Sequence, residues 1–401
     1  MHKTRLLTLL LFLLCVAKLT FADKVTVSTV TFADKVTVST VTLAPGGAQG
    51  YFTVSLEGST AYTAYQMDIS LPDGVEIASA DGQPMIFMAN DAYSIDGKDI
   101  YPFTSSTNAF TGVVTKTYTH AFKFESQTDG AVRVICYSSE SKPLTATSGA
   151  LFHVFVKASP YAKPGADEVA LNNVRFSTPA AVETRFDDTD ATAITVAGEC
   201  SLPVNISADN RFGTCVLPFA ATLPEGLEAY SCSTCSGDAL LLTPATGIEA
   251  YVPYIVYAPA GFSGILSGTP TEADYTARVS DGQATNGYLT AALKQTELVA
   301  DESGQTYYVL QRKADTEAPM FYRVGTTSYI LPEGKCFLTL PQAVATAATL
   351  RLGGANGLPI VTTDELPNSP IYNLQGQQVP HAEPGQIYIQ NGRKMLKNIN
   401  H

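Results

Sequence analysis

The strongest constraint on the fold is an alternation of apolar and polar side chains that recurs along most of the chain. In the stretch GYFTVSLEG, the apolar residues Phe52, Val54 and Leu56 alternate with polar ones, and AYQMDISL repeats the pattern. Successive side chains of a strand point to opposite faces of a sheet, so this alternation predicts half-buried β-strands. Helix-length periodicity is missing from the sequence. We therefore expect an all-β protein with less than about a tenth of its mature chain in α-helix.

The first residues have the pattern of a secretory signal peptide. Lys3 and Arg5 precede a twelve-residue apolar run over residues 6–17, and small residues at Thr20 and Ala22 predict cleavage after Ala22. The apolar run is shorter than the roughly 18 to 20 residues that a membrane helix needs, and no later stretch reaches that length. We expect no transmembrane segment and a protein that is secreted or associated with the cell surface or outer membrane.

An exact repeat follows the signal peptide. Residues 20–30 recur unchanged as residues 31–41, and only the second copy continues into TLAPGG and the next strand. Because one position in a sheet accepts one strand, the sequence predicts a mobile duplicated arm over residues 23–34. The first ordered strand is expected within residues 35–43.

The charge of the chain is strongly acidic. The full chain has 25 basic and 37 acidic residues, a net charge of −12, which becomes −15 when Lys3, Arg5 and Lys18 leave with the signal peptide. Such a surface repels phosphate backbones, so nucleic acid is not an expected partner. The 20 Tyr and 18 Phe residues favour strands, and Trp is absent.

Composition and turn signals divide the mature chain into parts. Short strands separated by turn residues predict a two-sheet β-sandwich or jelly-roll over residues 35–198, and more closely spaced strands predict a second β-rich domain over residues 205–345. Residues 346–368 lack periodicity and are rich in Gly, Pro, Asn and Asp, as in a linker. Residues 369–401 predict a short C-terminal β-hairpin.

Two stretches of the first domain are similar to a known fold: LAPGGAQGYFTVSLEG, from Leu43 to Gly58, and GALFHVFVKASPYAKPGADEVALNNVRFST, from Gly149 to Thr178. The first resembles the opening turn and second strand, and the second resembles the closing strands, of the cohesin-like sandwiches of surface and scaffold proteins. The resemblance implies protein recognition, while carbohydrate-binding modules share the same pattern.

The C-terminal segment IYNLQGQQVPHAEPGQIYIQNGRKMLKN resembles the sorting domains of proteins that Bacteroidetes export by the type IX route. It is about 30 residues long, against about 80 in the fuller domain. The matching positions include Ile371, Tyr372, Leu374, Gly376, Gly385 and Tyr388.

Residues suited to catalysis or ligand binding are few. Gly-x-Ser-x-Gly, His-Glu-x-x-His and phosphate-binding glycine loops are absent from the sequence, so we expect neither an enzyme nor a cofactor. The densest acidic cluster, Asp187, Asp188 and Asp190, is a candidate calcium loop because calcium binds several oxygen ligands, although a solvated loop is the simpler interpretation. Tyr251, Tyr254 and Tyr257 are candidates for a sugar-stacking platform if their rings are exposed.

The cysteines leave their pairing open. Six remain after signal cleavage and permit up to three disulfides in an exported chain. Cys232 and Cys235 form a Cys-x-x-Cys element between strand-like segments, where a structural role is simpler than a redox role.

These patterns together predict a non-enzymatic, exported cell-surface protein that acts in adhesion or scaffold-type protein recognition. The alternative is a carbohydrate-binding component of a glycan-degrading system, whose partner would be a polysaccharide.

Overall fold

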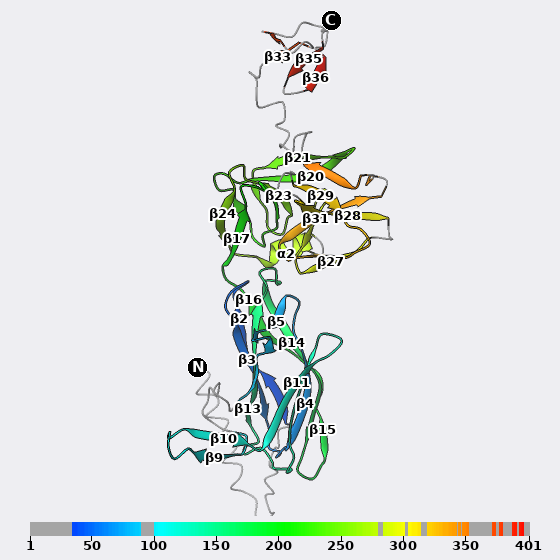
Figure 1. The fold of residues 1–401 in the computed structure, drawn as a ribbon. Helices are drawn as coiled ribbons and strands as arrows, with labels where there is room; N and C mark the ends of the chain where they lie inside the picture. The colour runs from blue at the N-terminus through cyan, green and yellow to red at the C-terminus, as the bar shows by residue number, and fades with distance from the viewer. Residues whose placement is uncertain are drawn as a thin grey trace, which may run out of the picture.

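The chain is built almost entirely from β-strands in its computed structural model (Figure 1). The structure describes residues 34–89, 100–279, 284–300, 304–313, 319–342, 344–345, 347–352, 371–373, 377–379, 387–390 and 393–396. Within these ranges the single helix is α2 (Glu272–Val279). The prediction of an all-β fold is therefore confirmed. In the same ranges, no helix is both long enough and apolar enough to cross a membrane.

Two sheets form a sandwich over residues 35–196. The first contains, in spatial order, β1 (Lys35–Val38), β3 (Gly50–Glu57), β13 (Gly149–Ala158) and β5 (Val75–Ile77), with β8 (Ile86–Met88) also pairing with β13. The second contains β11 (His120–Ser126), β12 (Val132–Ser138), β4 (Ala64–Ser70), β14 (Gly165–Ser177), β16 (Thr189–Val196) and β2 (Val41–Leu43), with β15 (Glu183–Arg185) on β14. The short pair β6 (Ser79–Ala80) and β7 (Gln83–Pro84) lies outside both sheets.

The alternation read from the sequence sets which side chains fill this sandwich. Phe52, Val54 and Leu56 of β3 are fully buried, and Met67 of β4 joins them in one apolar cluster that spans both sheets. Strand β13 pairs with strands on both of its edges, and Phe152 lies fully buried at the centre of the cluster. Apolar burial between two sheets is the main stabilisation of such a fold.

The second copy of the repeat links the two sheets. Strand β1 pairs antiparallel with β3, and after Ser39 the chain crosses to the other sheet, where β2 pairs parallel with β16. Asp34 anchors the start of this segment: its carboxylate accepts hydrogen bonds from the Ser59 amide at 2.7 Å and from the Tyr62 hydroxyl at 2.9 Å. The first ordered strand expected within residues 35–43 is β1, and a second strand, β2, follows it there. Asp34, the last residue of the predicted mobile arm, is held by hydrogen bonds, and residues 23–33 lie outside the described part.

Deleting residues 23–33 is expected to leave the thermal midpoint within about 2 °C, because the described contacts of the repeat belong to its second copy. The Asp34→Ala variant is the matched control: it loses two hydrogen bonds and should lower the free energy of unfolding by about 1–2 kcal/mol. Differential scanning calorimetry compares the two. A drop of about 10 °C on deletion would show that the first copy is structural.

A ten-stranded sheet forms the centre of a second domain over residues 200–352. Its strands, in spatial order, are β18 (Phe212–Cys215), β23 (Tyr254–Tyr257), β20 (Glu228–Ser236), β21 (Ala239–Ala245), β32 (Thr349–Leu352), β29 (Met320–Arg323), β28 (Gln305–Gln311), β31 (Lys335–Pro341), β26 (Leu289–Ala292) and β25 (Thr285–Asn286). Three two-stranded pairs accompany it: β17 (Cys200–Ile206) with β24 (Phe262–Gly268), β19 (Ala221–Thr222) with β22 (Gly247–Ile248), and β27 (Thr296–Leu298) with β30 (Tyr329–Leu331). Strand β32 lies in the stretch whose composition suggests a linker, and its Leu350 and Leu352 are buried.

A tyrosine of the sandwich joins the two domains. Tyr161, in the loop between β13 and β14, is buried in the apolar cluster of the second domain, and its hydroxyl donates to the Val216 carbonyl at 2.8 Å. Gly334 faces it with a φ of +76°, and a Cβ there would lie 2.4 Å from the Tyr161 hydroxyl. Ser159 adds a hydrogen bond to Glu333 at 2.9 Å. The sandwich and the second domain are thus held by side-chain packing as well as by the chain between β16 and β17.

The C-terminal element is a four-stranded antiparallel sheet rather than a single hairpin. Its order is β34 (Gln378–Val379), β33 (Ile371–Tyr372), β35 (Ile387–Gln390) and β36 (Arg393–Leu396). The hairpin predicted over residues 369–401 had one strand in each of two segments, whereas each segment forms a pair of strands, β33 with β34 and β35 with β36.

Candidate functional site

The tyrosines that the sequence suggests as a sugar platform are covered. Tyr251, Tyr254 and Tyr257 are 0%, 4% and 7% exposed. Tyr254 packs in one apolar cluster of the second domain and Tyr257 in another, because β23 has apolar neighbours on both faces. Sugar stacking needs an accessible ring, so these three side chains do not present the expected platform.

The acidic candidates do not converge on a common point. Asp187, Asp188 and Asp190 are exposed, and an oxygen of Asp188 accepts a hydrogen bond from the Asn173 amide at 3.0 Å. Across the described residues, no group of three or more His, Cys, Asp or Glu side chains is arranged to hold a metal ion. Asp187 and Asp188 therefore lie in a solvent-exposed loop, and Asp190 lies at the start of β16.

Other predicted positions lie partly outside the described residues. Ala22, Leu374, Gly376 and Gly385 are not described. Of the sorting-like motif, Ile371 and Tyr372 lie in β33 and Tyr388 lies in β35, so strands β33 and β35 bring these three positions into one sheet.

The six cysteines in the described part of the chain are all free thiols. Burial raises the pKa of Cys200 and Cys215 to about 11 and that of Cys136 and Cys232 to about 12. Thiols with such values are protonated at neutral pH and are weak nucleophiles. Cys232 and Cys235 lie on β20 across a register shift, not at the start of a helix, which matches a structural role.

The clearest exposed feature is a hairpin that stands off the sandwich. It consists of β9 (Phe103–Thr107), β10 (Val114–Tyr118) and the turn between them, and we call residues 103–118 the arm. The two strands form a sheet of their own, and Figure 1 shows the arm projecting sideways from the end of the sandwich. Nearly every residue of the arm is exposed. An isolated two-stranded sheet is only marginally stable in water, so the arm needs local support.

A hydrogen-bonded turn supports the tip of the arm. The Asn108 side-chain oxygen accepts from the amides of Phe110 at 2.9 Å and Thr111 at 3.1 Å. The Asn108 amide donates to the Val113 carbonyl, and Gly112 has a φ of +68°, a conformation that favours glycine. The turn thus fixes the backbone of Phe110, whose side chain is 99% exposed.

Buried residues support the base of the arm. Tyr101 and His120 flank it in sequence, both are buried, and their rings make an edge contact with centroids 5.6 Å apart. The Tyr101 hydroxyl donates to the Leu151 carbonyl at 2.7 Å, and the Thr119 amide donates to the Pro102 carbonyl at 2.9 Å. Burial lowers the pKa of His120, so this side chain is neutral at neutral pH. The base is therefore fixed in the sandwich core.

The arm concentrates apolar surface. Phe103, Phe110, Val113 and Val114 are four of the exposed large apolar side chains of the described residues, and they lie within twelve positions of one another. The arm contains no acidic residue and a single basic one, Lys116, whose ammonium lies 4.4 Å from the centroid of the Phe103 ring. They lie at both ends of the arm, since Phe103 pairs with Tyr118 at its base and Val114 pairs with Thr107 next to its turn. Exposed apolar side chains gathered on one element in this way are typical of interaction surfaces.

The arm is not among the candidate sites predicted from the sequence. Its usable signal was the Asn108 to Gly112 turn between two runs rich in Thr and Val. That pattern predicts a hairpin, but it does not show that the hairpin lacks a covering sheet.

Comparisons with known proteins give fold-level similarities. No protein-family model matches the chain, and neither does any curated protein. Solved structures do: a non-cellulosomal cohesin from Archaeoglobus fulgidus has 11% identity and a TM-score of 0.27, covering 41% of this chain and 91% of its own. The sixth cohesin from scaffoldin B of Acetivibrio cellulolyticus, solved with a Cel5 dockerin, has 16% identity and a TM-score of 0.28, covering 41% and 99%.

A longer stretch is similar to a pilin. The major pilin SpaD from Corynebacterium diphtheriae has 12% identity and a TM-score of 0.24, covering 58% of this chain and 51% of its own. Cohesins and pilins are thus among the structures to which the chain is similar, and its function has to be argued from its own residues.

Proposed function

We propose that this chain is a non-catalytic, exported cell-surface protein that recognises a protein partner in adhesion or scaffold-type assembly, and that the arm makes the first contact. The single observation that carries this proposal is Phe110, a large apolar side chain almost fully exposed on an ordered turn. Burying such a side chain in a partner contributes roughly 1.5–3 kcal/mol. Aromatic anchors are frequent energetic centres of protein interfaces.

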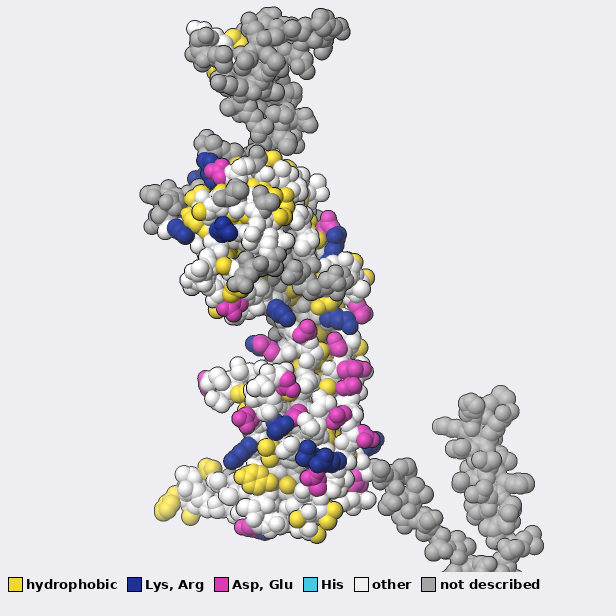
Figure 2. Space-filling view, turned by 90° about the vertical axis from the view of Figure 1, so that its right-hand side faces the viewer, with side chains coloured by type: hydrophobic (Ala, Val, Ile, Leu, Met, Phe, Trp, Pro, Cys, Tyr) yellow, Lys and Arg dark blue, Asp and Glu magenta, His cyan; other side chains and the backbone are white. Residues whose placement is uncertain are grey.

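The arm suits a protein cleft better than an anionic membrane or polymer. The chain has a net charge of −12, and acidic side chains are spread over the sandwich face in Figure 2. Long-range repulsion therefore disfavours an anionic surface. The arm itself is nearly uncharged, which allows it to enter an apolar cleft at little cost in desolvation.

The packed junction between the two domains supports a role in which the second domain holds the sandwich, and with it the arm, out towards a partner. Tyr161 holds the sandwich against the second domain, so a force or an anchor acting on one domain is transmitted to the other. We further propose that residues 1–22 direct export and that the sorting-like strands β33 and β35 contribute to attachment. The sandwich limits 35–198 belong to the same proposal. The second domain, by contrast, includes β17 and β32, so it extends beyond the predicted limits 205–345 and into the first part of the predicted linker 346–368.

Site-specific photo-crosslinking on intact producing cells tests this function. A benzophenone amino acid in place of Phe110 is expected to give a discrete crosslinked protein, whereas the same group in place of Val182 is not. Val182 is the matched control because it is 59% exposed on the same sandwich but lies in the loop between β14 and β15, not in the arm.

Competition makes the test quantitative. Added wild-type protein should abolish the crosslink, and the Phe110→Ala variant should compete at least about tenfold less well, which corresponds to about 1.4 kcal/mol. Equal crosslinking at positions 110 and 182, or equal competition by the wild-type protein and the Phe110→Ala variant, would show that the arm does not contact the partner.

A further inference from the structure

The first two strands of the sandwich fill a position that we call the slot: the edges of β3 and β16 that residues 34–43 cover. Strand β1 pairs with β3 at the end of the first sheet, and β2 pairs with β16 at the end of the second. Val36, Val38 and Val41 pack against the core between the sheets, and Leu43 is buried in it. A segment in the slot therefore completes both sheets along one side of the sandwich (Figure 1).

Polar contacts fix the register of the segment in the slot. The Lys35 ammonium lies 2.8 Å from the Glu57 carboxylate. The Ser39 amide donates to the Thr53 carbonyl at 2.9 Å, and the Thr53 amide donates to the Ser39 hydroxyl at 2.9 Å. Hydrogen-bonded positions alternate along an antiparallel pair, so Thr37, two residues before Ser39, also bonds to β3 through its backbone. A segment that fits the slot must repeat these groups at the same spacing.

The first copy of the repeat carries the same groups at the same spacing. Shifted by eleven positions, residues 23–31 are identical to residues 34–42. The shift places Asp23 on Asp34, whose carboxylate accepts two hydrogen bonds from the loop after β3. The predicted signal cleavage lies directly before Asp23, so it leaves the whole set in the mature chain. Residues 23–31 can therefore make every hydrogen bond and ion pair that the structure gives residues 34–42.

Two differences favour the second copy. In the shifted register Phe32 takes the place of the buried Leu43, and a larger side chain strains a packed core. The shift also lengthens the connection between β2 and β3 by eleven residues, and closing a longer loop costs conformational entropy that grows slowly with its length. The second copy therefore fills the slot in the intact chain, which is why deleting residues 23–33 is expected to leave the thermal midpoint almost unchanged. Loss of β1 itself reverses this preference.

We propose that the first copy is a spare strand, which takes the slot of its own molecule when the second copy is displaced. The short tether gives it a higher effective concentration than a strand from another molecule has. The exchange moves eleven residues into the connection after β2. That connection contacts the domain junction, because the Gly46 amide donates to the Ala158 carbonyl at 3.0 Å and a Cβ at Gly46 would lie 3.0 Å from Pro160, the neighbour of Tyr161. The exchange therefore links the N-terminal strand to the junction.

Carbodiimide crosslinking of the mature chain tests the proposal, because the reagent joins a lysine to a carboxylate that it contacts. The wild type is expected to give the Lys35–Glu57 link, since these groups are 2.8 Å apart. Thr37→Pro removes a backbone donor that faces β3 and should replace this link by Lys24–Glu57, in at least about tenfold excess. Mass spectrometry of the linked peptides identifies the lysine.

Two controls accompany this variant. The Lys157–Glu76 link, between groups 2.9 Å apart on β13 and β5, is the internal standard because these strands keep their places in both registers. Thr26→Pro, the same change in the first copy, should keep the wild-type link and the wild-type thermal midpoint. Combining Thr26→Pro with Thr37→Pro breaks both copies, so this variant should lose the link at Glu57 and melt at a lower temperature than Thr37→Pro.

Three results would each overturn the proposal. The first is a Thr37→Pro chain without the Lys24–Glu57 link, whether it keeps the Lys157–Glu76 link or has lost that link by unfolding. The second is equal thermal midpoints of Thr37→Pro and the variant with both substitutions. The third is a Lys24–Glu57 link that joins two chains, seen as a dimer on denaturing electrophoresis. The crosslinking test of the arm does not depend on any of these results, so the two assignments can fail separately.

Discussion

Replacing Tyr161 with alanine is expected to lower the free energy of unfolding of the second domain by about 3 kcal/mol and to loosen the junction with the sandwich. Removing a buried aromatic side chain costs about 3–5 kcal/mol through lost burial and the cavity that remains. Tyr161 is 7% exposed in the apolar cluster of the second domain, and we take the low end of the range because the truncation lies at a domain boundary. Urea unfolding measures the first effect, and small-angle scattering measures the second as a broader distribution of interdomain distances.

Two further variants separate the causes. Tyr161→Phe removes only the hydrogen bond to the Val216 carbonyl and should cost about 1 kcal/mol. Gly334→Ala should be destabilising because a Cβ would lie 2.4 Å from the Tyr161 hydroxyl and because alanine disfavours a φ of +76°. In the Tyr161→Ala background the close contact with the tyrosine hydroxyl is gone and only the unfavourable φ remains. Gly334→Ala should therefore lower the free energy of unfolding by less in that background than in the wild type. An unchanged cost would show that the two residues are not coupled.

Period-two patterning predicted the sandwich well and the exposed surface poorly. Phe52, Val54 and Leu56 are buried as the alternation requires, because one face of β3 packs on the core and the other does not. The same rule misleads at β23, where Tyr254 and Val256 enter one cluster and Ile255 and Tyr257 enter another. A strand covered on both faces hides every side chain, whatever its pattern.

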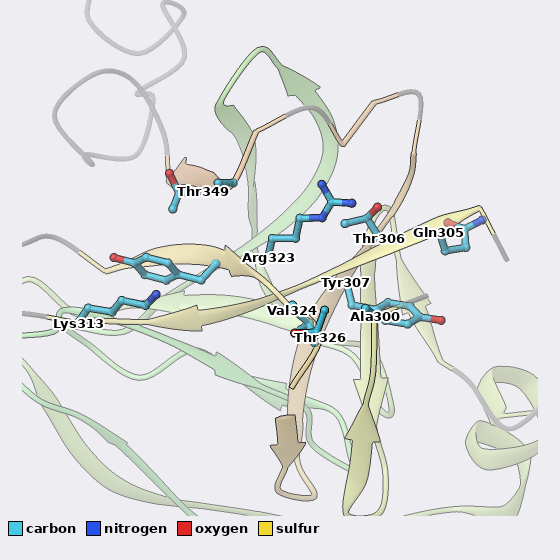
Figure 3. A pocket seen from close by; sticks show the side chains of 12 residues that line it. Ala300, Gln305, Thr306, Tyr307, Lys313, Arg323, Val324, Thr326 and Thr349 are labelled. Atoms are coloured by element: carbon cyan, nitrogen blue, oxygen red, sulfur yellow. The ribbon is translucent and has the colours of Figure 1, made fainter. Parts of the chain in front are cut away.

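The arm shows the opposite case. Its Thr and Val residues form strands as β-propensity predicts, but no second sheet among the described residues covers them, so Val113 and Val114 remain exposed. The pattern within one segment predicts which of its side chains share a face. It does not predict which other segment packs on that face. A cavity of about 510 Å³ in the second domain is missed for the same reason, since its lining residues come from three strands brought together by pairing (Figure 3).

A buried carboxylate on the outer face of the sandwich also depends on pairing between distant strands. Asp68 of β4 is 6% exposed and accepts two hydrogen bonds from the Arg133 guanidinium, at 2.6 and 2.7 Å. The Asn173 side chain donates a third at 2.7 Å from a register shift in β14, where Asn173 has a φ of +52°. Asp68 therefore links β4, which lies between them, to β12 on one side and to the irregular part of β14 on the other.

Asp68→Ala is expected to lower the free energy of unfolding of the sandwich by about 3 kcal/mol, the low end of the range for breaking a buried pair, because Arg133 is partly solvated. Glu183→Gln is the matched control: it breaks the Glu183–Arg185 pair, which is largely exposed and screened by solvent, and should leave the free energy of unfolding nearly unchanged. Urea unfolding of both variants makes the comparison. Equal costs would mean that Asp68 acts as an ordinary surface charge.

The pH dependence of stability gives a sharper test of the same group. Hydrogen bonds from Arg133 lower the pKa of Asp68 below its ordinary value, further aided by Asn173. A carboxyl whose pKa is lower in the folded state contributes its stabilisation fully above the unfolded pKa of about 3.9 and loses it as the pH falls through the folded pKa. The difference in unfolding free energy between wild type and Asp68→Asn should therefore be constant near neutral pH and shrink below about pH 4. A difference that stays constant down to pH 2 would show that the carboxylate charge does not stabilise this part of the sandwich.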